Sequence, residues 1–249
     1  MIRVLEEAAM NAWPAFQTRL YDGWVLRFAA GYTRRANSIN PIYSGSLDLV
    51  EKIEICEGIY TRQGLATIFK LTELDEAAGL DEMLAGRGYQ YDAVTSVQTL
   101  DLTGLSGISS PDVIFSPAAR APWRSAFNRM HAVDETSQVV HAQILSLILP
   151  QTAFVGMESG PGQMVSCGLG VLQNGYLGIF DLVTDPDFRR HGYAETLMHS
   201  LLAWGQKQGA RTAYLQVMIN NPPALALYAG LGFRESYHYW YRVKTLPLS

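Results

Sequence analysis

Residues 185–197 read DPDFRRHGYAETL, and they place two arginines, a histidine and a glycine directly before a predicted helix. The free backbone N–H groups at a helix start, aided by the helix dipole, favour an anion such as a phosphate. Gly192 would let the backbone approach that ligand closely. Basic residues before a helix are also common on solvated surfaces, so the stretch alone leaves both interpretations open.

Strands and helices are predicted on both sides of this stretch. Two apolar strands, 164–172 and 175–184, surround the hairpin signal QNG, and the helix after the loop ends at Gly209. The other predicted strands of this half are 113–117, 151–159, 211–219 and 237–244, and the other helices are 121–133, 136–149 and 221–233.

The first half of the chain repeats this order more faintly. LAGRGY at 84–89 corresponds to YAGLGF at 228–233, and the two follow Pro41 and Pro186 at nearly the same spacing. Strands are predicted within 24–40 and at 65–73 and 95–102, and helices at 47–60 and 77–89. The Gly- and Ser-rich segment 103–113 is the predicted linker between the two repeats.

The composition narrows the classes of function. The 249 residues carry a formal net charge of −4, and the pI is near 5.7, which disfavours nucleic-acid binding because that requires a basic face. Cys56 and Cys167 lack metal-ligand spacing and the five histidines are scattered, so no metal site is expected. The absence of a signal peptide and of a run of about 18 apolar residues predicts a cytoplasmic protein without a membrane segment.

Two motifs in the second half resemble signatures of the GNAT superfamily of acyl-CoA N-acyltransferases. RRHGYA at 189–194 matches the phosphate signature Arg/Gln-x-x-Gly-x-Gly/Ala. NPPALALYAGLGF at 221–233 matches the later signature Asn-x-x-Ala-x-x-Leu-Tyr-x-x-x-Gly-Phe. Both occur in the strand–loop–helix–strand–helix order of that family. The resemblance is strong over residues 113–245 and weak over the first repeat.

The resemblance implies that acetyl-CoA is bound as a co-substrate. Its pyrophosphate would lie on the loop of Arg189, Arg190, His191, Gly192, Tyr193 and Ala194. Its pantetheine arm would pair with the preceding strand, with Leu182 and Val183 as backbone partners and the Val183 N–H meeting the oxyanion. Asn221 either holds the coenzyme or caps its helix.

Acetyl transfer from a thioester to an amine requires a proton acceptor for the amine and benefits from a proton donor for the thiolate. Asp181 is the first candidate base, with a hydrogen-bonded structural aspartate as the alternative, and Glu158 is a weaker candidate. The resemblance implies that Tyr228 is the acid, with a packing tyrosine as the alternative. Cys167 is expected in the core, so that transfer would be direct, in a ternary complex.

The acceptor amine has no motif of its own in the sequence. The aromatic stretch 237–239 predicts either a strand with alternating buried rings or contacts to the acceptor. Arg34, Arg35 and Asn37 belong either to an exposed strand face or to the acceptor site. A small-molecule amine and a peptide amine both stay open, as do the length of the acyl chain and the oligomeric state, with a homodimer among the options.

These observations predict an α+β fold with a mixed, mostly antiparallel central sheet flanked by helices, in two tandem GNAT-like copies. Residues 1–105 would form a degenerate copy without a coenzyme site, because the phosphate signature is missing and Leu84 stands where the second copy has Tyr228. Residues 111–249 would form the catalytic copy, an acetyl-CoA-dependent N-acetyltransferase. The alternative is a non-catalytic acyl-CoA-binding regulatory module.

Overall fold

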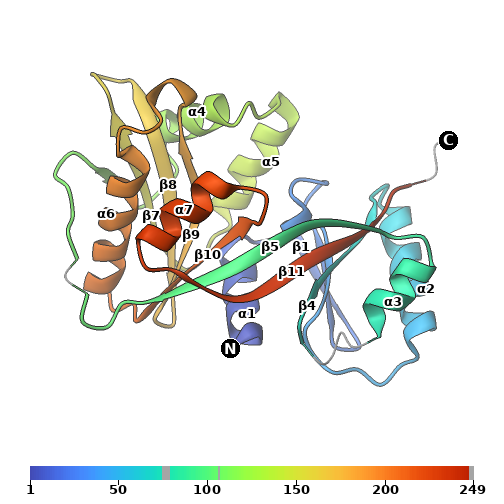
Figure 1. Cartoon of the computed structure of the whole chain (residues 1–249). Coiled ribbons are helices and arrows are strands. Elements are labelled where there is room, and N and C mark those ends of the chain that lie inside the picture. Colours follow the sequence, from blue (N-terminus) through green and yellow to red (C-terminus); the bar gives the residue numbers. More distant parts are fainter. Residues whose placement is uncertain (75–78, 106, 247–249) are drawn as a thin grey trace. The chain divides into compact units, whose positions relative to one another are not determined.

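The computed structural model of the chain describes residues 1–74, 79–105 and 107–246. They form two compact units, each assembled from segments that are separated in sequence. Unit 1 comprises Met1–Val97, Met218–Asn220 and Glu235–Ser249, and unit 2 comprises Gln98–Val217 and Asn221–Arg234. Each unit has a sheet with flanking helices (Figure 1), which confirms the predicted α+β class.

Unit 2 contains residues 185–192, called the basic loop, which join its strand β9 to its helix α6. Its sheet has the order β6-β7-β8-β9-β10, followed by the last residues of β5. The bounds are β5 Gln90–Asp101, β6 Ile114–Ser116, α4 Ala121–Met130, α5 Glu135–Ser146, β7 Gln151–Glu158, β8 Met164–Gln173, β9 Tyr176–Thr184, η3 Pro186–Phe188, α6 Tyr193–Lys207, β10 Thr212–Met218 and α7 Pro222–Gly230. Neighbours from β6 to β9 are antiparallel, and β9 and β10 are parallel.

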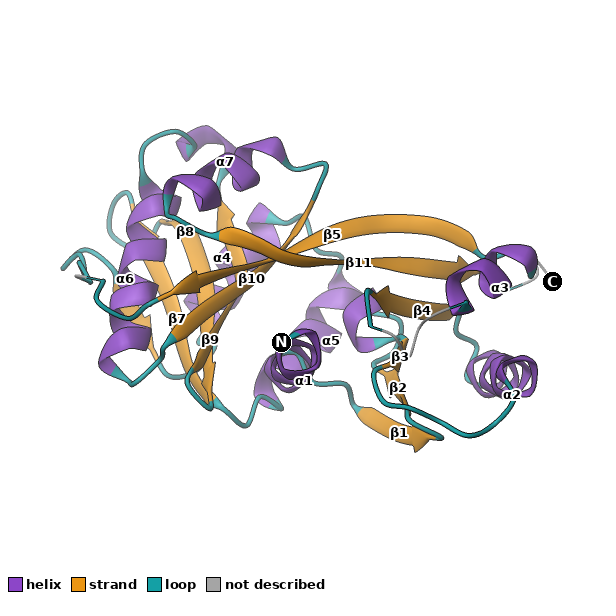
Figure 2. Ribbon diagram, turned by 60° about the horizontal axis from the view of Figure 1, so that its bottom comes forward, coloured by secondary structure: helices purple, strands orange, loops and turns teal. Residues whose placement is uncertain are grey.

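The core of unit 2 forms where α6 packs on one face of this sheet, while α4 covers the other face (Figure 2). Leu197 and Leu201 of α6 are fully buried, and burial of such a side chain is worth about 1.5–3 kcal/mol. Two glycines allow the close approach. A Cβ added at Gly170 would lie 2.8 Å from Leu201, and one at Gly205 would lie 2.6 Å from Leu177.

Unit 1 has the sheet order β1-β2-β3-β4-β11-β5. Its further bounds are α1 Ile2–Ala12, β1 Gln17–Tyr21, β2 Trp24–Phe28, η1 Arg34–Ala36, β3 Ile39–Pro41, α2 Leu49–Arg62, β4 Thr67–Thr72, α3 Leu80–Gly86 and β11 Arg234–Lys244. Buried polar side chains connect α1 to the sheet of unit 1. Glu6 is completely buried, forms an ion pair with Lys70 of β4, and accepts a hydrogen bond of 2.7 Å from the Tyr237 hydroxyl of β11.

The last strand of the chain lies in the first unit. β11 follows α7 of unit 2 in sequence, but it pairs antiparallel with β4, from Tyr239 opposite Thr72 to Lys244 opposite Thr67. In the other direction, β5 begins in unit 1 and its residues from Gln98 onward belong to unit 2. The compact units therefore have boundaries other than the predicted division at 105 and 111, and the division into two sequence copies stays a prediction.

The predicted elements of the second half are all present, with shifts of a few residues at their ends. In the first half, α1 and β1 were not predicted, although Leu5, Ala8, Ala9 and Ala12 of α1 follow helical spacing and are buried. The stretch 33–40, predicted to be strand, begins with the 3-10 turn η1 and reaches β3 only at Ile39. Residues 77 and 78 of a predicted helix and residue 106 of the predicted linker lie outside the described residues.

Candidate active site

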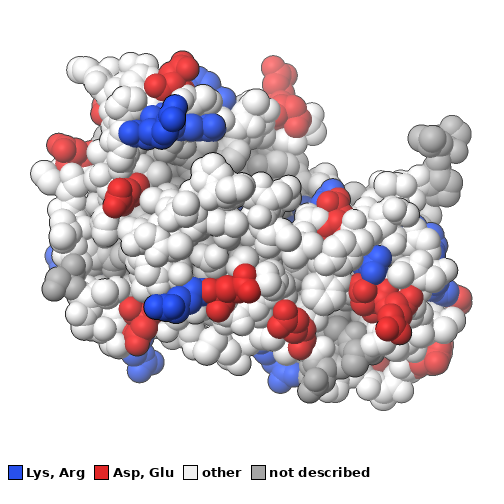
Figure 3. Space-filling model, in the orientation of Figure 1, with Lys and Arg blue, Asp and Glu red and all other residues white. Residues whose placement is uncertain are grey.

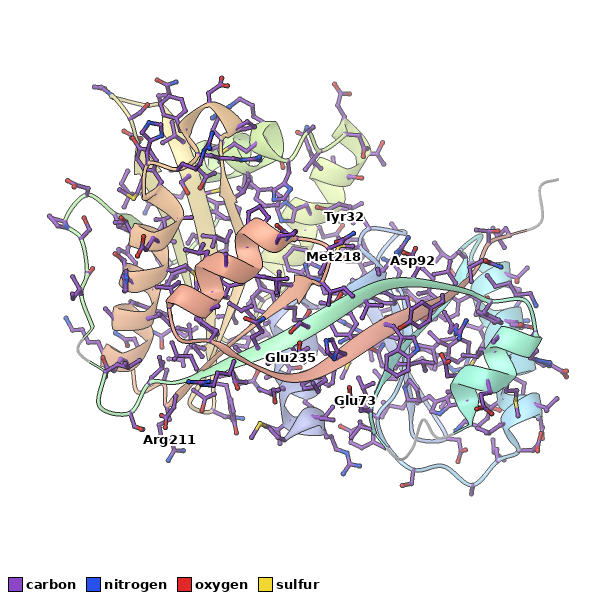
Figure 4. All side chains as sticks on the ribbon, in the orientation of Figure 1. Tyr32, Glu73, Asp92, Arg211, Met218 and Glu235 are labelled. Atoms are coloured by element: carbon purple, nitrogen blue, oxygen red, sulfur yellow. The ribbon has the colours of Figure 1, made fainter. Side chains whose placement is uncertain are left out.

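The parallel strands β9 and β10 separate at one end of unit 2. Their register ends at Ile179 opposite Leu215, whereas β9 continues to Thr184 and β10 to Met218, which is labelled in Figure 4. Within the described residues, Val183 and Thr184 have register partners on β8 only. We call the side of β9 that faces away from β8, beyond the last β10 pair at Ile179, the open edge. Backbone groups there can pair with a ligand.

The direction of the backbone decides which residues face the open edge. The Val183 carbonyl accepts a hydrogen bond of 2.9 Å from the Ser166 hydroxyl, and the Asp185 N–H donates to β8 at 2.8 Å. Because backbone groups alternate in direction along a strand, Leu182 and Thr184 turn theirs towards the open edge. Of the two predicted backbone partners, the geometry favours Leu182. By the same alternation, the Val183 N–H, predicted to meet the oxyanion, would face β8.

The basic loop joins the open edge to the start of α6. Arg189 and Arg190 are exposed, and the Arg189 Nε lies 3.4 Å from the Thr184 carbonyl oxygen at the end of β9. The His191 ring turns back, with its Nδ1 2.9 Å from the Arg189 carbonyl oxygen. Lys and Arg side chains gather at this end of unit 2, where α6 begins (Figure 3). The open edge and the concentration of positive charge are therefore neighbours in the fold.

The start of α6 lacks a side-chain cap. Gly192 occupies the N-cap position with φ +81°, and Tyr193 and Ala194 are the first helical residues. A φ in this region favours glycine, because a Cβ would collide with the following backbone. Nothing lies within 4 Å of a Cβ built at Gly192, so the space above it is open. The first-turn N–H groups of α6 are thus placed to meet an external anion.

Asp181 lies at a bulge of β9, where the register with β8 shifts between Cys167 and Leu169. Its φ is +51°, which is uncommon for a residue other than glycine. Its side chain is 6% exposed, and its Oδ2 lies 3.0 Å from the Nε2 of His141 on α5. The sequence predicted a functional or a structural Asp181, and it gave no sign of the buried His141 partner.

The rings of α4 pack beside this pair. The Trp123 indole N–H lies 3.0 Å from the Val155 carbonyl oxygen and 3.2 Å from that of Gly168, next to the bulge. Cys167 is completely buried, and this burial raises the pKa of its thiol. A protonated, buried thiol is a poor nucleophile, which agrees with the predicted core role of Cys167 and gives no support to a covalent acyl-enzyme.

Tyr228 lies on α7 and packs against the core cluster of unit 2, as Leu182 and Tyr193 also do. Its ring meets Phe233 edge-on, with 6.1 Å between the ring centroids. Burial raises the pKa of Tyr228 to about 12, so the hydroxyl keeps its proton at neutral pH. A proton donor must hold its proton before the reaction, and Tyr228 meets this condition.

Asn221 caps α7, since its Oδ1 accepts a hydrogen bond of 3.3 Å from the Ala224 N–H. We expect Asn221→Ala to lower the free energy of unfolding by about 1 kcal/mol, measured by urea denaturation, because an N–H loses its acceptor. Asp134→Ala is the matched control, because Asp134 caps α5 in the same way. The coenzyme Kd of both variants then tests the predicted coenzyme contact. A rise confined to Asn221→Ala would support it, and equal Kd values would leave the cap as its role.

The other candidates of the sequence have local partners of their own. Glu158 accepts a hydrogen bond of 3.0 Å from the Gly162 N–H in the turn after β7. Tyr237 and Tyr239 are buried rings of β11, as the strand alternative predicts, and His238 lies between Glu235 at 2.9 Å and Glu73 at 3.8 Å. Glu235 and Glu73 are labelled in Figure 4.

The polar candidates of unit 1 are engaged in local structure. Asn37 is buried, and its Oδ1 accepts from the N–H groups of Ala29 and Gly31. Arg34 forms an ion pair of 2.7 Å with Asp92, and Arg35 lies over the Trp13 ring. These contacts give the three residues roles in shaping the turn around η1.

In unit 1, an aspartate side chain is bonded to the backbone just before α2. Asp22 accepts from the N–H groups of Ser46 and Leu47, at 2.9 and 3.0 Å, just before α2. These backbone bonds and the Lys52 ammonium hold the pKa of the Asp22 carboxyl well below its ordinary value. The backbone N–H groups before α2 are therefore bonded to a carboxylate. The absence of a coenzyme site from residues 1–105 stays a prediction.

No cluster of three metal-ligating side chains occurs among the residues that the structure describes. The helices of the described ranges are also too short or too polar to cross a membrane.

The sequence was compared with known protein families and with individual proteins, and the matches are to acetyltransferases. The family model described as "Probable histone acetyltransferase Rv0428c C-terminal" matches residues 1–242. The uncharacterized N-acetyltransferase YobR of Bacillus subtilis is 26% identical over 250 residues, which is 98% of each chain. The ribosomal protein bS18-alanine N-acetyltransferase of Escherichia coli is 38% identical over 58 residues, which is 23% of this chain and 39% of that protein.

Two solved structures share the fold over most of their length. A GCN5-related N-acetyltransferase from Kribbella flavida has a TM-score of 0.68 at 16% identity, and the match covers 98% of this chain and 96% of that one. A tandem GNAT protein from the clavulanic acid biosynthesis pathway has a TM-score of 0.67 at 12% identity, covering 98% and 88%. Both matches span unit 1 as well as unit 2.

Proposed function

Because the chain belongs to the GNAT superfamily of N-acetyltransferases, in the family whose model spans residues 1–242, we propose that it moves an acetyl group from acetyl-CoA to a primary amine by direct attack in a ternary complex. The observation that carries this proposal is the open edge of β9 beside the uncapped start of α6. The open edge of β9 can pair with amides, and the start of α6 attracts phosphates. Coenzyme A contains both groups in one molecule.

The residues that would hold the coenzyme follow from this arrangement. Arg189, Arg190, His191, Gly192, Tyr193 and Ala194 would bind the pyrophosphate, mainly through backbone N–H groups and the helix dipole. The pantetheine amides would pair with backbone groups of Leu182 and Thr184. In this proposal the Leu182 N–H takes the oxyanion role, because the alternation of β9 points it towards the open edge.

The transfer needs two proton movements. The amine nitrogen attacks the thioester carbon, a C–N bond forms, and the amine proton passes to the Asp181 carboxylate directly or through one water. The C–S bond breaks, and the thiolate receives the proton of the Tyr228 hydroxyl. Asp181 later releases its proton to solvent and Tyr228 regains one, so the net products are an amide and a thiol. The raised pKa of Tyr228 keeps it in its donor form at neutral pH.

The acceptor class follows from chemistry and from relatives rather than from this site. The E. coli relative acts on an alanine of a ribosomal protein, and the family description names histones. Forming the neutral amine at pH 7 costs about 1.4 kcal/mol for an α-amine with a pKa near 8 and about 4.6 kcal/mol for a lysine with a pKa near 10.4. A base such as Asp181 is therefore worth more to a lysine acceptor.

The proposal predicts both binding and turnover. At 100 times its Kd, coenzyme A should add about 2.7 kcal/mol to the free energy of unfolding, seen as a rise in Tm. Acetyl-CoA with a panel of amines should release thiol with at least one class. The panel contains an N-terminal alanine peptide, a lysine peptide, free amino acids, aminoglycosides and small alkylamines.

Each failure has a separate meaning. A rise in Tm without thiol release on any amine would favour the binding module over the enzyme. The absence of both a rise in Tm and thiol release would contradict the proposed coenzyme site as well as the enzyme.

A further inference from the structure

A buried ion pair links α5 to the strand of the proposed active site. His141 is 1% exposed, and its ring Nε2 lies 3.0 Å from the Asp181 Oδ2, whose side chain is 6% exposed. A buried carboxylate needs a hydrogen-bond donor, since an unpaired buried charge is costly. His141 supplies that donor from a segment 40 residues away in sequence.

The bulge in β9 turns the Asp181 side chain towards His141. One extra residue of β9 is inserted opposite Gly168, and Asp181 takes a φ of +51° there, a conformation that is uncommon for a residue other than glycine. Bulges are frequent beside active sites because they redirect one side chain without ending the strand. Here the same insertion directs Asp181 towards α5 while Leu182, the next residue, presents its backbone to the open edge.

Aromatic rings of α4 lie beside the His141 side of the pair. The His141 ring lies 4.5 Å from the Phe127 ring and 6.5 Å from the Trp123 ring, measured between centroids.

His131, at the end of α4, and the Cys167 thiol of β8 both interact with Asp181 electrostatically. Arg129 of α4 lies 3.6 Å from Asp185, the residue after β9.

We propose that His141 is the positioning residue of the reaction, holding the Asp181 carboxylate in the orientation that accepts the amine proton. The inference rests on the acetyl transfer proposed above. The Nε2–H donates to Oδ2, which fixes the plane of the carboxylate and stabilises its charge. The proton of the attacking amine then passes to the remaining oxygen, Oδ1, directly or through one water.

A matched pair of variants separates this role from packing. Methionine and glutamine have nearly the same shape, but only glutamine offers an N–H donor to Asp181. We expect His141→Met to lower kcat roughly 10-fold or more, and His141→Gln to keep kcat within about 3-fold of the native value. The coenzyme Kd and the KM of the amine should stay unchanged in both. His199→Gln, on the exposed face of α6, is the surface control.

The pH profile provides the readout that a loss of packing would not move. The amine used is the one of the panel that the native protein acetylates fastest, with acetyl-CoA at saturation. Above the pKa of that amine, the acceptor arrives already neutral, and the base is needed only for the proton lost during attack. The loss in His141→Met should therefore shrink as the pH rises. A purely structural defect would lower kcat by the same factor at every pH.

The outcomes are distinct. Native kcat in His141→Met, a loss that His141→Gln does not restore, or a loss that is independent of pH would each overturn the positioning role. If urea denaturation shows that His141→Met does not fold, His141→Leu takes its place in the same comparison. A native protein that releases no thiol with any amine overturns the proposed function itself, and this inference with it. Native turnover with an unaffected His141→Met overturns only the inference.

Discussion

Gly192→Val is expected to abolish coenzyme binding, raising Kd by about 10²-fold or more. Two effects combine in this variant. The φ of +81° at Gly192 suits glycine and costs other residues about 1–2 kcal/mol, more for a β-branched one, so the loop would leave this conformation. The isopropyl group would also project into the open space above the α6 N-terminus, where the pyrophosphate is proposed to lie. Isothermal titration with coenzyme A measures the result.

Gly209→Val is the matched control for this variant. Gly209 follows the other end of α6 with φ +92°, and nothing lies within 4 Å of a Cβ built there. The control therefore carries the same kind of backbone strain and the same new side chain, away from the basic loop. We expect it to lower the free energy of unfolding and to leave the coenzyme Kd near the native value. Native affinity in Gly192→Val would show that the phosphate seat is elsewhere.

Tyr228→Phe is expected to lower kcat by about 10²-fold at pH 7 while the coenzyme Kd stays nearly unchanged. The substitution removes the hydroxyl that is proposed to protonate the thiolate, and it keeps the ring that packs on Phe233. The effect is limited because a thiol with a pKa near 8.5 is already a tolerable leaving group. Steady-state kinetics with saturating acetyl-CoA measure the change.

The pH dependence adds a second test of this acid. The pKa of about 12 means that native Tyr228 remains protonated from pH 6 to 9, so its titration should not appear in the kcat profile over that range. Tyr176→Phe, at the opposite end of β9, is the control and should behave as the native protein. A kcat of Tyr228→Phe equal to the native value would exclude the acid role and leave Tyr228 as a packing residue.

The fold of unit 2 could be predicted because its signals are local. The glycine turn at 173–175, the basic loop and the proline at the start of α7 each specify a boundary through backbone chemistry. The periodicity of α6 then identifies the helix that covers the sheet. Local signals of this kind are weaker in unit 1. The sequence of α1 excluded a signal peptide, but the helical spacing of its buried residues was not used to predict a helix.

The site could be predicted only as far as its motifs extend. The loop and Tyr228 lie inside motifs, but His141 belongs to a helix whose neighbours Val140, Ile144 and Leu145 are ordinary core residues. A polar residue on that buried face was the available signal, and its partner 40 residues away could not be read from spacing. The bulge at Asp181 has no signature either, since a positive φ at a non-glycine residue depends on tertiary packing.

β11 pairs within unit 1, and the end of β5 belongs to unit 2. This arrangement determines what happens when the chain is divided into two fragments. Severing it within 103–112 would separate β11 from its partner β4, because β11 would remain on the second fragment. The first fragment would then carry β4 as an exposed edge, and strands of that kind invite aggregation. The second fragment would lose the strand residues that β5 supplies from Gln98 onward. We therefore expect that neither fragment folds alone, and that the proposed active site requires the whole chain.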